Sequence, residues 1–257
     1  MTETGYDFME TRIDALTIPE LNARIAQSIG RGDQVIVANH NLHSLYLYHH
    51  DRKMRDYYAR AGYVHVDGMS LILLGKLLGL PLGREHRVTY VDWLDPLMAE
   101  AARRGWRVFY LGSEPEVAER GAKILRERFP GLRIAVYHGY FDARPESGEN
   151  RAVVEEINAY GSDLLMVGMG MPRQEHWVVD NLDRLHTNVI LNSGAAMDYV
   201  AGAVSTPPRW AGRVGLEWLF RLLAEPRRLW RRYLVEPWFV LRLFLVELSK
   251  RRGFRAG

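Results

Sequence analysis

The chain has 257 residues, long enough for one large domain or for a domain with an appendage. Hydrophobic residues make up 47% and charged residues 25%, a balance typical of a globular protein rather than a disordered one. There is no cysteine, which excludes disulfides, zinc–thiolate sites, iron–sulfur clusters and thiol nucleophiles. The first residues lack the apolar core of a signal peptide, and no uncharged apolar run could span a bilayer, so we expect neither a leader nor a membrane span.

The net charge of +3 conceals an uneven distribution along the chain. Residues 207–257 hold 12 Lys and Arg against 4 Asp and Glu, a net charge of +8, and residues 1–206 carry a net charge of −5. A basic segment of this kind is typical of contact with phosphate groups, nucleic acid or a membrane surface. Because Pro207 and Pro208 resist helix continuation, we divide the chain there into a body and a basic appendage.

Short apolar runs alternate with helical stretches along the body. Helices are expected over residues 19–29, with Thr17 as the cap, over 115–129 and over 145–159. Strands separated by helices indicate βαβ units, so the predicted fold class is α/β, with a Rossmann-like, mainly parallel sheet flanked by helices. The candidate strands are residues 34–38, 63–66, 106–111, 132–137, 163–167 and 188–191.

Small and polar residues follow every predicted strand, where ligands of open parallel sheets bind. Asp67 comes directly after the second strand, where it could act as a general base, bind a ribose or cap the next helix. Gly112 and Ser113 turn the third strand into a helix, and this turn could bind a phosphate or be an ordinary Ser-capped turn. Gly168 and Gly170 begin a dinucleotide fingerprint that lacks its third glycine, so a nicotinamide cofactor is only weakly indicated.

The sequence does not predict a metal site. Nine histidines are scattered along the chain, and none belongs to an HExxH or facial-triad pattern. There is also no Asp-x-Asp pair that could hold a divalent cation on a diphosphate, because Asp92 and Asp95 are three residues apart and fit a helix entrance better. We therefore expect no metal and no other cofactor.

The appendage is helical by its periodicity, with a restart at Glu225-Pro226. An aromatic, arginine-rich amphipathic stretch is typical of binding to an anionic membrane surface. The alternative is a helix packed on the core with its charges in solvent, and nucleic acid is not expected as a partner because no nucleic-acid motif accompanies the charge. The apolar stripe after the restart consists of Trp230, Leu234, Trp238, Leu241, Leu245 and Leu248.

Taken in order, these segments resemble the WecG/TagA/CpsF family, glycosyltransferase family 26. The resemblance covers nearly the whole chain, and eight segments in register make a chance match improbable. The matching segments are VANHN at 37–41, VHVDGMSL at 64–71, RVTYVDW at 87–93, FYLGSEPEVAERGAKIL at 109–125, HGYF at 138–141, VGMGMPRQEHW at 167–177, NSGAAMDYVAG at 192–202 and GLEWLFRLLAEPRR at 215–228.

The resemblance implies an inverting glycosyltransferase that acts without a metal. The donor would be a UDP-sugar carrying N-acetylmannosamine, its uronic acid or a related hexose or uronic acid. The acceptor would be a polyprenyl-diphosphate-linked sugar, in the synthesis of cell-envelope polysaccharide or exopolysaccharide. Such an enzyme would be cytoplasmic and peripheral on the inner face of the membrane, with an appendage that closes over the active site, and it could form a homo-oligomer.

The resemblance also assigns roles to single residues. The family's general base falls on Asp67, and Asn39 stands where the family often has a threonine. A one-step inversion needs a carboxylate to take the acceptor proton, and arginines can stabilise departing UDP in place of a metal. Two other classes stay open, a nicotinamide-dependent oxidoreductase and a non-enzymatic membrane-surface or RNA-binding module. The expected substrate-binding residues are Asn39, Asn41, Arg87, Gly112, Gln174, Arg221, Arg228 and Arg231.

Overall fold

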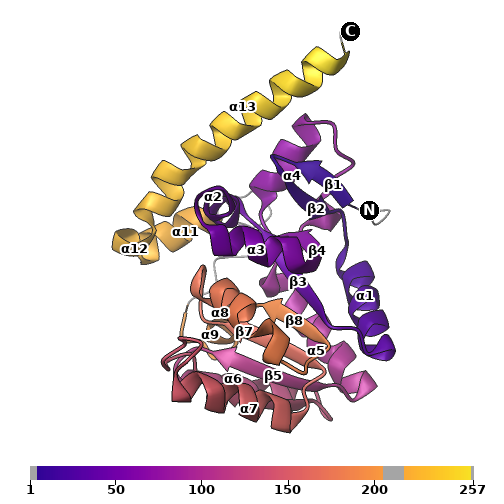
Figure 1. Cartoon of the computed structure of the whole chain (residues 1–257), viewed down its shortest axis with the longest axis vertical. Coiled ribbons are helices and arrows are strands. Elements are labelled where there is room, and N and C mark those ends of the chain that lie inside the picture. Colours follow the sequence, from indigo (N-terminus) through magenta and orange to yellow (C-terminus); the bar gives the residue numbers. More distant parts are fainter. Residues whose placement is uncertain (1–4, 205–216, 256–257) are drawn as a thin grey trace.

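The computed structural model describes residues 5–204 and 217–255 (Figure 1). In this part of the chain an antiparallel hairpin, β1 (Gly5–Phe8) and β2 (Thr11–Asp14), accompanies a six-stranded sheet whose paired strands are all parallel. The sheet order is β4-β3-β8-β7-β5-β6, so the predicted α/β class is confirmed. The sheet strands are β3 (Val35–His40), β4 (Ala61–Val66), β5 (Arg107–Gly112), β6 (Arg133–Tyr137), β7 (Leu164–Gly168) and β8 (Val189–Asn192).

Helices connect the strands of the sheet, and the three expected from the sequence are present as α1, α6 and α7. Thr17 caps α1 in a reciprocal capping box with Glu20, as its position before Pro19 predicted. The helices of the body are α1 (Ile18–Arg31), α2 (Leu42–His50), α3 (Arg52–Arg60), α4 (Met69–Leu77), η1 (Arg84–His86), α5 (Tyr90–Arg104), α6 (Pro115–Arg128), α7 (Gly148–Tyr160), α8 (Arg173–Asn181), η2 (Leu182–Arg184) and α9 (Ala196–Val200).

Each face of the sheet is covered by a hydrophobic core. Alternate strand residues point to opposite faces, as Leu191 packs with Trp93 of α5 while Ile190 packs with Trp177 of α8. Helices α1, α5, α6 and α9 contribute to one core, and α3, α7 and α8 contribute to the other. Both faces are buried, which explains why the strands are continuous apolar runs rather than alternating ones.

A third core lies at one end of the molecule, between the hairpin, α2, α4 and the appendage. The hairpin was not predicted, because its two strands of four residues carry no continuous apolar run. Phe8 of the hairpin, Leu45 of α2 and Leu71 of α4 meet there with Val240 and Phe244 of the appendage. The described appendage therefore shares a core with the body, although the boundary predicted at Pro207-Pro208 lies outside the described residues.

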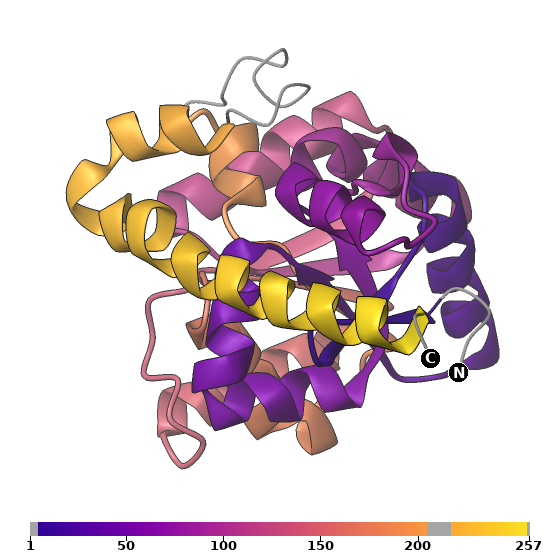
Figure 2. The ribbon, with the colours of Figure 1, turned by 90° about the horizontal axis from the view of Figure 1, so that it is seen from above.

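The described appendage consists of α11 (Glu217–Ala224), α12 (Pro226–Trp230), the π-helical η3 (Arg231–Val235) and α13 (Glu236–Arg255). The restart expected at Glu225-Pro226 is confirmed, since α12 begins at Pro226. Figures 1 and 2 show α13 as a long helix lying across one end of the molecule. Within residues 5–204 and 217–255, no helix has both the length and the apolar character needed to cross a membrane.

Candidate active site

The carboxyl ends of β3 and β4 bring together two asparagines and an aspartate. The parallel register pairs Asn39 with His65 and His40 with Val66, so Asp67 emerges beside Asn41. The backbone N–H of Asp67 donates to the carbonyl of His40 over 2.9 Å. The side-chain amides of Asn39 and Asn41 both point to Asp67 Oδ2, at long distances of 3.4 and 3.5 Å. This pair of amide donors orients the Asp67 carboxylate.

Asp67 does not cap the following helix. The N-cap residue of α4 is Gly68, so the cap interpretation of Asp67 is wrong. Asn41 is the residue that caps a helix here, because its Oδ1 accepts from the Ser44 N–H of α2 over 3.0 Å. That cap fixes the orientation of the Asn41 amide and directs its Nδ2 toward Asp67.

Arg87 lies beside the same strand end. It forms an isolated parallel bridge with Val66, and the next residue, Val88, donates its N–H to the Val66 carbonyl over 2.8 Å. The Arg87 side chain is only 10% exposed, and its guanidinium lies 3.6 Å from a carboxylate oxygen of Asp92. Burial together with the nearby charge of Asp67 raises the pKa of Tyr90, which places that tyrosine near the same carboxylate. The structure therefore brings Asn39, Asn41, Asp67 and Arg87 to one edge of the sheet.

Gly112 ends β5 where three backbone segments pack closely. A Cβ added at Gly112 would lie 2.3 Å from the carbonyl oxygen of Gly168, so only glycine fits without backbone movement. The Ser-capped turn proposed for Ser113 is wrong, because the N-cap of α6 is Glu114 and the Ser113 hydroxyl instead bonds with Tyr110 Oη over 2.7 Å. Phosphate binding at this turn stays a prediction, and a surface hollow of about 410 Å³ beside it is lined by Glu114, Pro115, Glu116 and Tyr140.

Gln174 is the second residue of α8 and is buried, and both ends of its amide are engaged. Its Oε1 accepts from the Gly170 N–H over 3.1 Å, and its Nε2 donates to Glu175 Oε1 over 2.8 Å. The side chain is 1% exposed, so contact with a substrate would require it or its surroundings to move. Its substrate-binding role stays a prediction.

Glu175 is a buried acid that the sequence analysis did not single out. It is 1% exposed, and its Oε1 accepts from Gln174. Burial raises the pKa of Glu175 to about 7, although the Gln174 hydrogen bond and the positive charge of Arg232 both act in the opposite direction. The signal for it was the apolar surroundings of the Gln-Glu pair at the start of a short amphipathic helix, which periodicity alone did not distinguish from a solvated first turn.

The appendage reaches this region through η3 and the start of α13. Arg232 lies close enough to Glu175 for its charge to lower the acid's pKa. His43 of α2 also pairs with Glu236, which begins α13, over 2.6 Å. Of the predicted appendage arginines, Arg231 is exposed at the start of η3, while the side chains of Arg221 and Arg228 lie outside what the structure describes.

Within the described part of the chain, no three His, Cys, Asp or Glu side chains gather in a group that could hold a metal ion. The buried histidines have other partners. His65 packs edge-on against Trp93 with its ring centroid 5.2 Å away, and His40 stacks on Tyr58 at 4.0 Å. The two amides on Asp67, with the Arg87 guanidinium at the same strand edge, suit polar and anionic ligands.

These features define an α/β protein with a polar site at the carboxyl edge of a parallel sheet, where such folds bind their ligands. The model of the glycosyl transferase WecG/TagA/CpsF family matches residues 6–253. The chain belongs to this family, and the resemblance inferred from the sequence is confirmed.

Curated relatives include proteins of Staphylococcus aureus strains NCTC 8325, COL and MRSA252. Each is named N-acetylglucosaminyldiphosphoundecaprenol N-acetyl-beta-D-mannosaminyltransferase, and each is 30% identical to this chain over 172 residues. The match covers 67% of this chain and 65% of each relative, so the chain spans a little less than two thirds of the relatives' length.

Proposed function

We propose that the protein is an inverting glycosyltransferase that moves a sugar from a UDP-sugar to a polyprenyl-diphosphate-linked sugar. The observation that carries this proposal is the cluster of Asn39, Asn41, Asp67 and Arg87 at one strand edge, in a chain of a glycosyltransferase family. The names of the staphylococcal relatives favour N-acetylmannosamine as the sugar and N-acetylglucosaminyl-diphosphoundecaprenol as the acceptor. The uronic acid and a related hexose are the other donor sugars to be tried.

Asp67 acts as the general base in this proposal. The acceptor hydroxyl oxygen attacks the anomeric carbon from the face opposite UDP, the bond to the diphosphate oxygen breaks, and the hydroxyl proton passes to Asp67. Asn39 and Asn41 hold the carboxylate in position through their hydrogen bonds to its Oδ2. An amide at position 39 can take this part even though the family often has a threonine there.

Arginines stabilise the departing UDP without a metal. Arg87 is nearly buried, so its charge is screened less by water than that of a surface arginine. Arg221, Arg228 and Arg231 of the appendage complete the diphosphate site, and the closeness of Arg232 to Glu175 supports an approach of this segment to the sheet edge. Removing one such contact typically costs about 3 kcal/mol of transition-state stabilisation.

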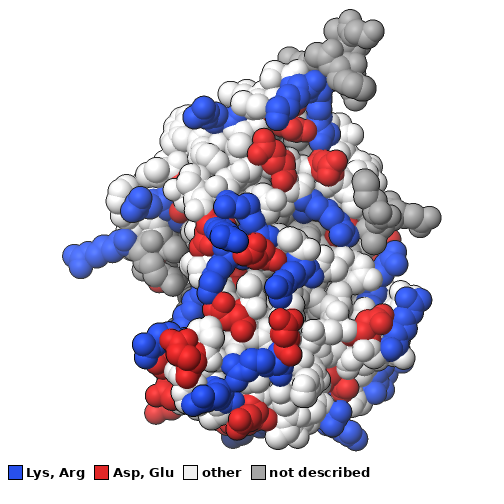
Figure 3. All heavy atoms as spheres, viewed as in Figure 1, with Lys and Arg blue, Asp and Glu red and all other residues white. Residues whose placement is uncertain are grey.

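The appendage also docks the protein on an anionic membrane surface. One face of α13 packs on the body through Val240 and Phe244, which are 1% and 7% exposed. The opposite face exposes large apolar side chains, with Trp238 71% and Leu245 55% exposed, and the surface along α13 is mostly uncharged in Figure 3. A helix of this kind lies in the membrane interface with its apolar face inserted. This proposal puts the enzyme at the inner face of the cytoplasmic membrane, where a lipid-linked acceptor is available.

The two other classes have weaker support. A nicotinamide cofactor usually binds a complete glycine fingerprint at a helix start, whereas the loop after β7 enters α8 through Pro172 and Arg173. A purely membrane-binding module would not need a carboxylate held by two amides at a strand end. Both classes are distinguishable from a transferase by calorimetric titration with UDP and with NADH.

The test is a panel of UDP-sugars offered with an N-acetylglucosaminyl-diphospho-lipid acceptor. We expect transfer from one N-acetylmannosamine-type donor with inversion at the anomeric carbon, measured by product mass and NMR. Asp67→Asn is the negative control, and Asp95→Asn, which removes an exposed carboxylate paired with Arg128, is the matched surface control. Absence of transfer from every donor, together with absence of UDP binding, would overturn the proposal.

A further inference from the structure

A chain of hydrogen bonds links the N-terminal hairpin to the candidate base, with His40 at its centre. Thr11 Oγ1 of β2 lies 3.0 Å from His40 Nε2, and His40 Nδ1 lies 3.0 Å from Ser44 Oγ. The Ser44 hydroxyl accepts from the Asn41 N–H over 2.8 Å and donates to the Asn41 carbonyl over 2.9 Å. The His40 carbonyl itself accepts from the Asp67 N–H. His40 therefore holds the backbone of Asp67 directly and that of Asn41 through Ser44.

The hydroxyl of Ser44 is shared between His40 and the backbone of Asn41. A hydroxyl has one hydrogen, which Ser44 can give to the Asn41 carbonyl or to His40 Nδ1. When it goes to the Asn41 carbonyl, His40 Nδ1 donates to Ser44 and its Nε2 accepts from the Thr11 hydroxyl. Burial, with His49 and His65 nearby, lowers the pKa of His40 to about 3, so the ring is neutral and has one hydrogen to give.

We propose that Thr11 and His40 are positioning residues that set the orientation of Asn41 and Asp67 for the transfer reaction. The inference rests on the proposed function, since it takes Asp67 as the general base. In this proposal Nδ1 carries the hydrogen and the Thr11 hydroxyl donates to Nε2. That tautomer fixes Ser44, Ser44 fixes the backbone of Asn41, and the Asn41 amide points to Asp67.

The ring of His40 is held in place for this role. It stacks on Tyr58 at 4.0 Å with an interplanar angle of 15°, and Tyr58 donates its hydroxyl hydrogen to the Asn39 carbonyl over 2.7 Å. Stacking and full burial restrict rotation of the ring, so its hydrogen bonds to Thr11 and Ser44 stay in place. Asn39, which carries the second amide on Asp67, is thus linked to the His40 ring through Tyr58.

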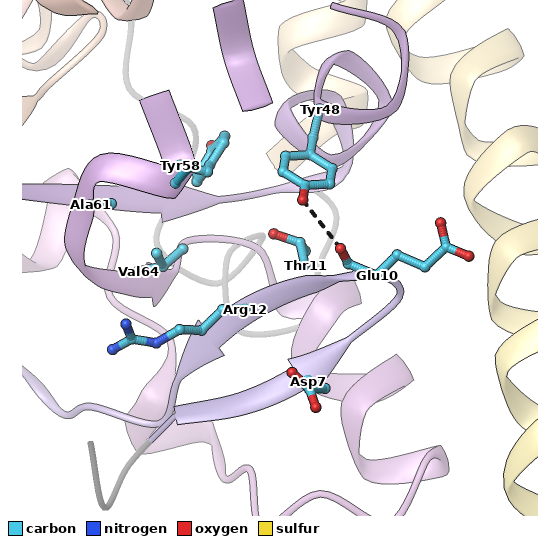
Figure 4. Close-up of a pocket in the computed structure, with 9 residues that line it drawn as sticks. Asp7, Glu10, Thr11, Arg12, Tyr48, Tyr58, Ala61 and Val64 are labelled. Carbon is cyan, nitrogen blue, oxygen red and sulfur yellow. Dashed lines mark hydrogen bonds between the residues drawn. The ribbon is translucent and has the colours of Figure 1, made fainter. Parts of the chain in front are cut away.

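Figure 4 shows the outer end of this series of hydrogen bonds, in a hollow of about 410 Å³ between the hairpin and α3. Thr11 points from β2 toward the part of the molecule that carries Tyr48 and Tyr58. The Tyr48 hydroxyl donates to the Glu10 carbonyl over 3.2 Å. This hydrogen bond also reaches the hairpin, but it is not part of the series of hydrogen bonds that leads to Asp67. Tyr48 is therefore a matched control for any loosening of the hairpin.

The experiment compares Thr11→Val, Thr11→Ser and Tyr48→Phe in the full chain. Valine keeps the shape and strand preference of threonine but cannot donate to His40, whereas serine keeps the hydroxyl. We expect Thr11→Val to lower kcat by about two- to tenfold with unchanged UDP affinity, because one neutral hydrogen bond is lost. Thr11→Ser should restore most of the rate, and Tyr48→Phe should keep the wild-type rate.

A second readout does not depend on turnover. Amide hydrogen exchange at Asn41 and Asp67 should be about two- to tenfold faster in Thr11→Val than in Tyr48→Phe, and ¹⁵N NMR should detect the Nδ1–H tautomer of His40 in the wild-type protein. An Nε2–H tautomer, or equal effects of Thr11→Val and Tyr48→Phe on kcat and on exchange, would overturn the inference. If the wild-type protein is inactive but shows the expected exchange pattern, the proposed function would be overturned, and the series of hydrogen bonds from Thr11 to Asp67 would still be supported.

Discussion

Replacing the buried acid Glu175 with glutamine should make the protein more stable, and more so as the pH rises. The glutamine can still accept from Gln174 through its Oε1, but it does not titrate. The pKa of Glu175 is raised from 4.5 to about 7 because burial disfavours the charged form. Between these pH values the unfolded chain loses the proton while the folded protein keeps it, so the free energy of unfolding of the wild-type protein falls as the pH rises.

The size of the effect follows from the two pKa values. Their difference corresponds to about 3 kcal/mol at about 1.4 kcal/mol per pH unit. The penalty is absent below pH 4.5 and complete above about pH 7. The stability of Glu175→Gln minus that of the wild-type protein should therefore grow by about 3 kcal/mol between pH 4.5 and pH 8.

The assay is urea denaturation of both proteins at a series of pH values, with the difference taken at each one so that other titrating groups cancel. Glu100→Gln is the control, since Arg103 and Arg104 lower the pKa of that surface carboxyl. For Glu100 the sign is opposite, because its contribution to stability is lost as the pH falls. If the stability difference between Glu175→Gln and the wild-type protein does not change with pH, or shrinks as the pH rises, Glu175 is not a buried acid that stays neutral in the folded protein.

Four other predictions concern activity and the membrane. Asp67→Asn should lower turnover by about 10²- to 10⁴-fold with UDP binding nearly unchanged, and retention of more than about a tenth of the rate would contradict the role of general base. Turnover should survive exhaustive chelation, and a loss that Mn²⁺ or Mg²⁺ restores would contradict the use of arginine in place of a metal. Trp238→Gln with Leu241→Gln should weaken binding to anionic vesicles in a flotation assay, while the exposed but distant Tyr140→Gln should not. Arg221→Ala should lose transfer and keep vesicle binding, and parallel loss of both would show that the two roles are inseparable.

The sequence by itself determined the secondary structure of the sheet and the places to look for the site. Both ends of every predicted strand lie within two residues of the observed ones, because a strand buried on both faces is a continuous apolar run bounded by polar residues. Asp67 was found for the same reason, as a charged residue directly after such a run. The apolar runs and the charged residue that follows one of them are both visible in the local sequence.

The helix starts were predicted less well, since capping depends on backbone geometry as well as residue type. Thr17 caps α1 as expected, but Gly68 and Glu114 hold the cap positions for which Asp67 and Ser113 were candidates. In the second case Ser113 adopts a positive φ of 56° and turns its hydroxyl to Tyr110. One residue of displacement at a turn is enough to change the partner, and residue types alone do not fix it.

The tertiary structure decided which strand ends meet and which faces are buried. The pairing of β3 with β4 and β8 puts Asn39 and Asn41 beside Asp67, and the short hairpin supplies Thr11 to His40. On α13, Val240 and Phe244 pack inward while the predicted apolar stripe remains mainly outside, with Leu248 partly buried. Periodicity shows that a helix has an apolar face but not what covers it, because burial depends on elements far away in the chain. The raised pKa of Glu175 has the same origin, since desolvation comes from the packed surroundings rather than from neighbouring residues in the sequence.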